Sequence, residues 1–181
     1  SNWNLLKKQI WKIIKELEWM KAFKRELKFE SYAKPVERDD LVEKNLDYYK
    51  PIFESFDKGG DKKVFNLHAM ILAPHWYIYR KMVLQGASII GLQVILAMVA
   101  SVMRQPLWIG IYILSFGLYV RAGFYGVHDY YKHVNKLKKQ GDEVAVKFRH
   151  KFMTDKSGVD GYIAGCWVGG TIFLYAVGIF L

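Results

Sequence analysis

The chain has 181 residues, of which 52% are hydrophobic and 24% charged, with a formal net charge of +10. The two kinds are segregated, because residues 83–120 contain one charged side chain, Arg104, and this argues against a single soluble core. The basic excess suits a face that meets anionic lipid head groups, and without an accompanying nucleic-acid-binding motif we expect no nucleic-acid partner.

The first predicted element is an amphipathic helix over residues 2–28, whose apolar side chains follow a three-and-four spacing. Such a helix binds a partner helix or lies in a membrane interface, and we favour these roles over a self-contained coiled coil. The partner-binding residues would be Trp3, Leu6, Ile10, Ile13, Leu17 and Met20. Charges interrupt every apolar run before residue 30, so we expect no signal peptide.

The next stretch completes an N-terminal cytoplasmic region, residues 1–64. "AKPVERDD" and "FDKGGDKK" are typical of loops and turns. Between them, "LVEKNLDYYKPIFESF" predicts a short amphipathic helix that is interrupted near Pro51.

Residues 65–82, "FNLHAMILAPHWYIYRKM", predict an interfacial or re-entrant segment broken at Pro74. The alternative is one kinked helix that merges with the first span. Aromatic and basic side chains at this position are typical of a membrane interface. We therefore assign as membrane anchors Trp76, Tyr79, Arg80, Lys81 and Arg121.

Three apolar stretches are long enough to cross a bilayer, which takes roughly 20 helical residues. Two form a predicted hairpin over residues 83–126, from Val83 to Met103 and from Pro106 to about Gly126, and the third covers residues 159–181. The alternative, a buried hairpin of a soluble protein, conflicts with stretches that are apolar on every face. The second helix is expected to continue to Gly141, within a basic region of residues 127–158. The predicted fold is therefore all-α, an integral membrane protein with three transmembrane helices, an N-terminal amphipathic helix and helical cytoplasmic extensions.

The basic residues predict the orientation of these spans. Seventeen Lys and Arg precede the first span, one lies at the Arg104 corner and nine lie in residues 121–158. Since basic residues near span ends stay on the cytoplasmic side, we expect the N-terminus on the cytoplasmic side of the membrane and the C-terminus on the opposite side.

Gly161, Gly165 and Gly169 repeat every four residues in the third span and predict a helix-packing face. The partner helix belongs to this chain or to another one, and the repeat does not choose between them. The single Cys166 excludes an intrachain disulfide.

Two motifs resemble a family of small bacterial membrane proteins, domain of unknown function 2628. The first is "NLDYYKPIFESFDKGGDKKVFNLHAMILAPHWYIYRKM", with its Tyr pair, Gly turn, Phe-Asn start and Tyr-Arg-Lys-Met end, and the second is "GVHDYYKHVNKLKK". The resemblance covers residues 45–139. It implies a topology rather than catalytic residues.

Candidate chemistry is limited to four histidines, His68, His75, His128 and His133, with Asp129 beside the second pair. Imidazole and carboxylate suit zinc or iron, and two histidines suit haem. However, residues five apart do not share a helix face, so we expect no metal, no cofactor and, without a catalytic motif, no enzyme.

The sequence thus favours a non-enzymatic accessory or scaffold subunit of a bacterial inner-membrane complex. Its partners would be membrane lipids and other membrane protein subunits or copies of itself. The alternative is a homo-oligomeric pore or membrane-remodelling protein, and a third hypothesis is a haem-binding or metal-binding membrane protein that uses the histidines.

Overall fold

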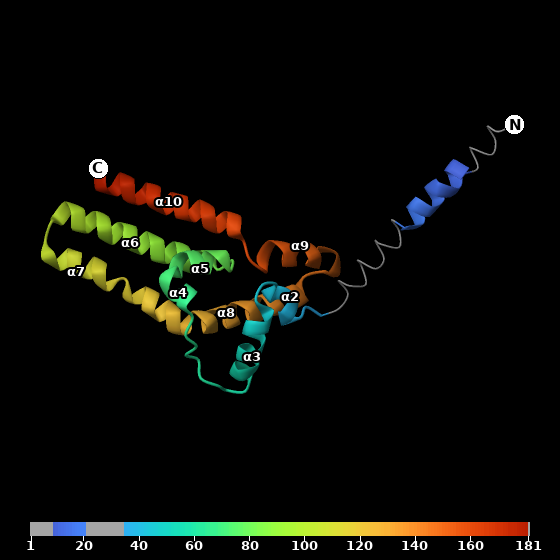
Figure 1. Ribbon diagram of the computed structural model, residues 1–181, viewed down its shortest axis with the longest axis horizontal. Coiled ribbons are helices and arrows are strands. Elements are labelled where there is room, and N and C mark those ends of the chain that lie inside the picture. Colours follow the sequence, from blue (N-terminus) through green and yellow to red (C-terminus); the bar gives the residue numbers. More distant parts are fainter. Residues whose placement is uncertain (1–8, 21–34, 181) are drawn as a thin grey trace.

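The computed structural model describes residues 9–20 and 35–180, and within these residues all regular structure is helical (Figure 1). After the helix of residues 9–20, the helices in chain order are α2 (Arg38–Val42), α3 (Leu46–Asp57), α4 (Leu67–Ile71), α5 (Ala73–Tyr79), α6 (Val83–Met103), α7 (Pro106–Leu114), α8 (Gly117–Glu143), α9 (Val146–Lys156) and α10 (Gly161–Phe180).

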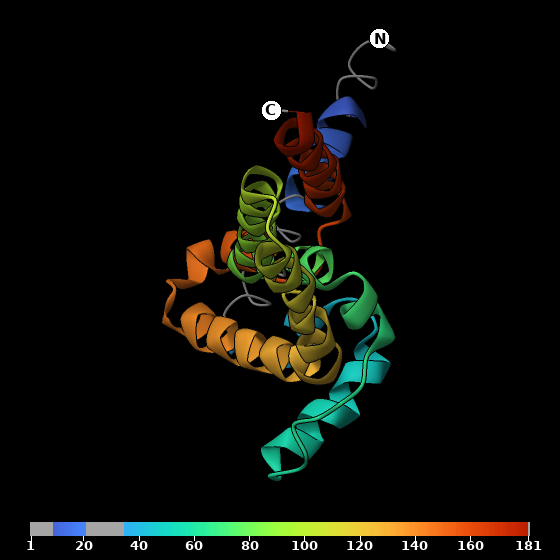
Figure 2. The same ribbon diagram turned by 90° about the vertical axis from the view of Figure 1, so that its left-hand side faces the viewer.

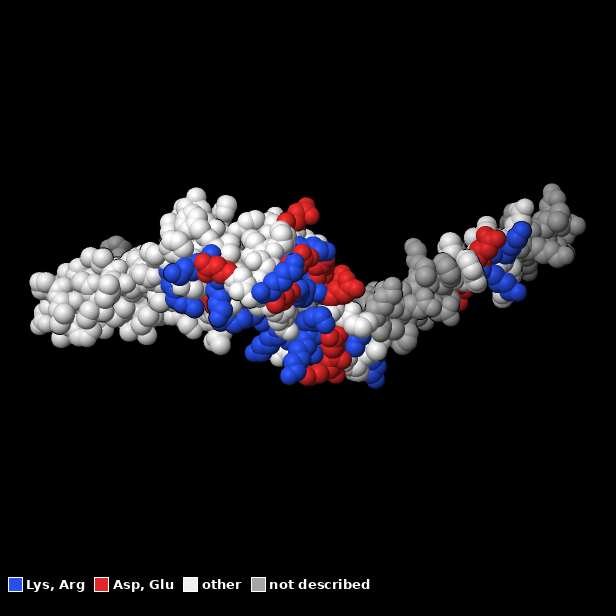
Figure 3. All heavy atoms as spheres, turned by 90° about the horizontal axis from the view of Figure 1, so that it is seen from below, with Lys and Arg blue, Asp and Glu red and all other residues white. Residues whose placement is uncertain are grey.

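Three long helices, α6, the α7–α8 pair and α10, are long and apolar enough to cross a membrane. Few of their side chains are covered by the rest of the chain: Leu84 and Val102 are each 79% exposed, and Tyr162 is 83% exposed. Figure 3 shows that the end of the molecule formed by these helices carries almost no charge in that view, whereas charges gather over the middle. Lipid is the solvent that suits such a surface.

Two cores hold helices α2 to α10 together. The first lies among α2, α3, α4, α5 and α8, and includes Tyr49, Phe53, Trp76 and Tyr130. The second joins α5 to α6 and α10 around Ile78 and Ile90. In Figure 2, α8 runs below α6 and α10 and at an angle to them. Helix α5 contacts α4 and α8 on one side and α6 and α10 on the other, so it lies between two groups of helices, one around each core.

Two glycines permit the closest helix contacts. A Cβ atom on Gly86 of α6 would lie 2.3 Å from the carbonyl oxygen of Pro74, and one on Gly123 of α8 would lie 2.7 Å from Cβ of Met70. The absence of a side chain therefore allows α5 to approach α6 and α4 to approach α8.

The predicted boundaries agree with the structure at α6 and differ elsewhere. The segment before the first span is two separate short helices, α4 and α5, because Pro74 begins α5 as a first-turn proline, and α6 starts anew at Val83. The expected interruption at Pro51 is wrong, since Pro51 lies inside α3. The chain turns instead at Glu43 and Asn45, both of which have positive φ.

The second apolar helix also differs in detail. Ser115 and Phe116 separate α7 from α8 through hydrogen bonds of the i to i+3 type. Helix α8 passes through Gly141, the expected end, and stops at Glu143. Gly141 is buried, and a Cβ atom there would lie 3.0 Å from Val36, so this glycine serves packing rather than helix termination.

Candidate functional site

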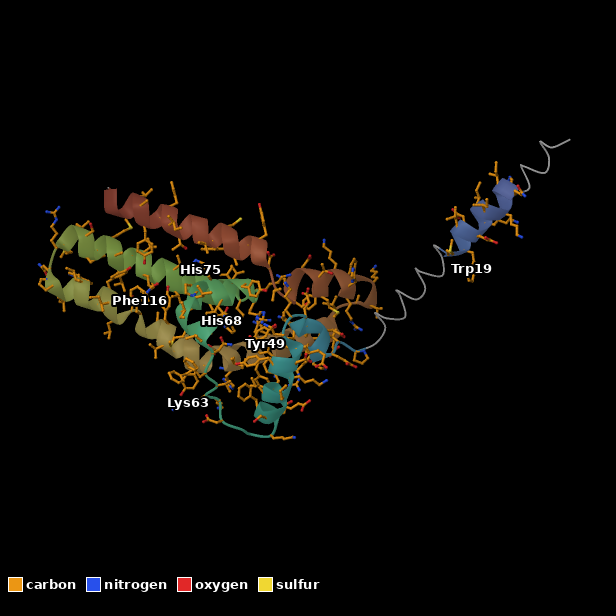
Figure 4. All side chains as sticks on the ribbon, in the orientation of Figure 1. Trp19, Tyr49, Lys63, His68, His75 and Phe116 are labelled. Carbon is orange, nitrogen blue, oxygen red and sulfur yellow. The ribbon has the colours of Figure 1, made fainter. Side chains whose placement is uncertain are left out.

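The helix of residues 9–20 carries four of the six predicted partner-binding residues, while Trp3 and Leu6 lie outside the described residues. Figure 4 shows Trp19 on this helix, far from the labelled side chains of the helical body. Its large apolar side chains are between 45% and 65% exposed: Ile10, Trp11, Ile13, Ile14, Leu17, Trp19 and Met20. The rest of the described chain therefore leaves this apolar surface uncovered.

The predicted glycine face on α10 is also open. A Cβ atom on Gly165 or Gly169 would meet nothing within 4 Å, and one on Gly161 would lie 3.9 Å from the Tyr79 ring. In the described part of the chain, no other helix packs against the two later glycines. The glycines that do allow close packing, Gly86 and Gly123, have no repeat that would have marked them in the sequence.

Arg80 and Trp76 differ most from their expected role as membrane anchors. Both are buried, with Arg80 2% and Trp76 7% exposed, so neither side chain reaches the molecular surface as an interfacial anchor would. The Arg80 guanidinium lies 4.6 Å from the ring centre of Tyr49 and 5.0 Å from that of Tyr130. These cation–π contacts place Arg80 in the first core. The sequence pattern of aromatic and basic residues did not predict that Arg80 is buried.

Arg80, Lys81 and Arg121 all bind protein groups. Arg80 Nη1 donates a hydrogen bond to the backbone oxygen of Lys44 at 3.1 Å. Lys81 Nζ donates to the backbone oxygens of Thr154 and Asp155, at 2.9 and 3.3 Å. These carbonyls belong to the last turn of α9, where a cation interacts favourably with the helix dipole.

Arg121 is the most exposed of the three predicted basic anchors, and it forms an ion pair with Asp129 on its own helix. Its Nη1 atom lies 2.9 Å from Oδ2 of Asp129. The same carboxylate oxygen accepts a hydrogen bond from Tyr77 Oη at 2.9 Å. This three-residue network ties α5 to α8.

A large cavity opens between α3, α4, α5 and α10 and has a volume of about 1010 Å³. Figure 4 shows Tyr49, His68 and His75 coming to this region from α3, α4 and α5. Aromatic and aliphatic side chains form most of its wall, with a smaller number of polar ones. The lining residues are Asn45, Tyr48, Tyr49, Phe65, Asn66, Leu67, His68, Leu72, His75, Trp76, Tyr79, Arg80, Ala164, Gly165 and Val168.

Arg80 is the cation of this cavity. Its Nε atom is buried without a hydrogen-bond partner. Burial lowers the pKa of His75, so this imidazole is neutral at pH 7. Burial raises the pKa of the Tyr49 hydroxyl, an effect that the Arg80 guanidinium partly opposes, so Tyr49 is neutral too. Arg80 is therefore the lining residue that brings a permanent positive charge to this cavity.

The four histidines singled out in the sequence are divided between two places. His68 and His75 line the cavity. His128 instead stacks on Tyr131 and packs against Phe56, and His133 lies further along α8. Within residues 9–20 and 35–180, no three His, Cys, Asp or Glu side chains are close enough together to hold a metal ion.

A second cavity, of about 300 Å³, lies among α5 and the three long helices and is lined partly by polar groups. Gln93 Nε2 donates to Ser115 Oγ at 3.2 Å, and Tyr119 Oη donates to Gln93 Oε1 at 3.3 Å. The Tyr112 and Tyr175 hydroxyls lie 3.2 Å apart. The sequence could have indicated this cluster, because Gln93 and Ser115 are polar residues inside apolar stretches. A count of charged residues does not detect them.

Together, the helices and their exposed apolar surface define an all-helical membrane protein with three helices that can cross a bilayer. Within that class, the chain belongs to the family described as Protein of unknown function (DUF2628), whose family model matches residues 29–136. This confirms the family resemblance of the two sequence motifs. The match includes α2 to α7 and most of α8 and leaves α10 outside. Comparison with curated proteins gives no match, and comparison with solved structures gives none.

Proposed function

We propose that this protein is a non-enzymatic accessory or scaffold subunit of a bacterial inner-membrane complex. The observation that carries the proposal is the helix of residues 9–20, which exposes Trp11 and Trp19 by 63% and 65%. A surface of this kind is stable in water only when another surface covers it. The proposed partner supplies an apolar groove or helix face for Ile13, Leu17 and their neighbours.

The open face of α10 supports the same proposal within the bilayer. Gly165 and Gly169 allow the backbone of a second helix to approach closely, as in a glycine zipper. This face would dock a membrane helix of the partner, while the N-terminal helix would bind it outside the bilayer. In this arrangement, the N-terminus and the α8–α9 connection lie on the cytoplasmic side and the C-terminus lies outside.

The alternative functions have weaker support. A homo-oligomeric pore or membrane-remodelling protein would use the same two faces, and no separate observation favours it. A metal or haem function rests on histidines of which only His68 and His75 line one cavity.

The proposal is tested by disrupting the apolar face of the N-terminal helix. The double variant Ile13→Glu with Leu17→Glu lowers the net charge by two and places carboxylates on that face. The matched control, Lys12→Ala with Lys15→Ala, also lowers the net charge by two and leaves the apolar residues unchanged. Extraction in a gentle detergent should give one defined larger complex for the wild type and the control and a smaller species for the double Glu variant.

Mass spectrometry of that complex decides between the two membrane functions. Other membrane proteins in fixed proportion support the accessory role, whereas a complex of this chain alone supports the homo-oligomer. A monomeric wild-type protein, or a complex that survives both Glu substitutions, contradicts the proposed role of this helix.

A further inference from the structure

The large cavity lies where the charged part of the molecule meets its membrane helices. Asp160, the residue before α10, donates its backbone N–H to the oxygen of Tyr79 at 2.9 Å, which ties the start of α10 to the end of α5. Ala164, Gly165 and Val168 then line the cavity from the first two turns of α10. At 1.5 Å per residue, they lie roughly 5–10 Å along the helix, which is the depth where lipid head groups give way to acyl chains.

Arg80 is a buried charge of this cavity with no carboxylate of the described residues at ion-pair distance. In residues 9–20 and 35–180, no carboxylate forms an ion pair with Arg80, although the side chain is 2% exposed. The Glu43 side chain, close by in sequence to the Lys44 carbonyl that Arg80 binds, packs against Gly158 instead. The tyrosine rings and this carbonyl offset part of the cost of burying a guanidinium, but Nε has no hydrogen-bond acceptor. An anion in the cavity beside the guanidinium would supply the opposite charge that no carboxylate supplies at ion-pair distance.

Much of the cavity wall suits a hydrocarbon chain. Leu72, Trp76 and Val168 are apolar, and Gly165 leaves open space, since a Cβ atom there would meet nothing within 4 Å. Asn45 and Tyr48 supply neutral polar groups at another part of the wall. A volume of about 1010 Å³ is that of a ligand site rather than of a packing defect. The occupant must therefore have an anionic end and an apolar end.

We propose that this cavity binds the head-group end of an anionic membrane phospholipid. The lipid phosphate lies beside the Arg80 guanidinium, a planar donor that is well suited to phosphate oxygens. The first part of an acyl chain follows α10 past Gly165 and Val168 into the bilayer, so a bound lipid takes the Gly165 part of the α10 face and leaves Gly169, one turn further on, for a partner helix. Basic pockets beside membrane helices are known to bind lipid head groups. Lipid binding at this site does not depend on whether the N-terminal helix binds a partner.

Native mass spectrometry of the delipidated protein tests this site by titration of the first bound lipid. The probes are phosphatidylglycerol and phosphatidylcholine with identical acyl chains, and inorganic phosphate as a competitor. Gly165→Leu fills the cavity from α10 without touching Arg80. Gly170→Leu is the matched control, because it adds the same side chain to α10 at a position that also has open space and does not line the cavity.

The wild type and Gly170→Leu should bind phosphatidylglycerol alike and more tightly than phosphatidylcholine, and Gly165→Leu should weaken the phosphatidylglycerol affinity by roughly tenfold. Arg80→Met should abolish the preference for the anionic lipid. Because Arg80 also packs in the core, the glycine pair carries the test if Arg80→Met does not fold. Equal affinity of Gly165→Leu and wild type overturns the site, and equal affinity for the two lipids overturns its anion selectivity. Displacement of phosphatidylglycerol by inorganic phosphate would mean a site for the free anion, which also overturns the lipid proposal.

Discussion

Gly86 shows how one missing side chain sets the distance between two helices. The carbonyl oxygen of Pro74 and the Ile78 side chain occupy the space where a Cβ atom of residue 86 would lie. This contact holds α5 against α6, and α5 in turn carries Tyr77 and Tyr79 and ends at its C-cap residue, Arg80. The position of the candidate lipid site therefore depends on a glycine that is not part of it.

Substitution of this glycine should destabilise the protein. We expect Gly86→Ala to lower the free energy of unfolding by about 1–3 kcal/mol, because backbone atoms cannot move aside as a flexible side chain can. Thermal unfolding in detergent measures the effect. Gly91→Ala is the control on the same helix, since a Cβ atom there meets nothing within 4 Å. Equal unfolding temperatures for both variants would show that the α5–α6 contact is looser than described.

At the scale of the element, α5 connects the two groups of helices although it has only 7 residues. Ala73 and Trp76 belong to the first core, and Ile78 belongs to the second. Lys81, which follows α5 with φ of 60°, continues this role by binding the last carbonyls of α9. A helix this short is stable only through such tertiary contacts.

Removal of the Lys81 charge should loosen α9 more than it affects the rest of the protein. We expect Lys81→Met to increase amide hydrogen exchange near the end of α9, since it removes two hydrogen bonds and a favourable dipole interaction of about 0.3–1 kcal/mol. Hydrogen exchange followed by mass spectrometry measures this. Lys151→Met removes a charge from α9 itself and serves as the control. Equal exchange in both variants would argue against the contact between Lys81 and the end of α9.

The whole molecule divides into a charge-poor end and a charged body. Figure 3 shows this division. Helices α6 and α10 carry no charged residue, whereas the α7–α8 pair continues from an apolar stretch into a charged one. Because a charged side chain is costly inside hydrocarbon, the division defines how far the protein enters the bilayer. It does not define which side of the membrane the charged body faces, and that prediction rests on the count of basic residues.

Chemical labelling tests the orientation. After Cys166→Ala removes the native thiol, a single cysteine replaces Gln105 in the corner between α6 and α7 or Lys58 after α3, both of which are exposed. We expect a membrane-impermeant maleimide to label residue 105 in intact cells and residue 58 only after permeabilisation. The reverse pattern would show that the charged body faces outward.

The spans and helical class follow from the amino-acid order because they depend on local properties. A stretch of roughly 20 apolar residues between polar ones must form a helix in lipid, since each backbone group needs a partner within its own segment. This is why the boundaries of α6 agree with the prediction to the residue. Local turn chemistry was less decisive, as Pro51 inside α3 shows, because packing against α8 outweighs one lost hydrogen bond.

Residue roles in the candidate site depend instead on segments that meet across long distances in sequence. Tyr77 and Asp129 are 52 residues apart, and the Arg80 hydrogen bond to Lys44 spans 36 residues. A pattern of Trp, Tyr, Arg and Lys looks the same whether it faces lipid or a core, so sequence suggested an anchor where folding buried Arg80 among tyrosine rings. The cavity likewise exists only because α10 returns to the end of α5, and its volume is a property of that packing rather than of any one segment.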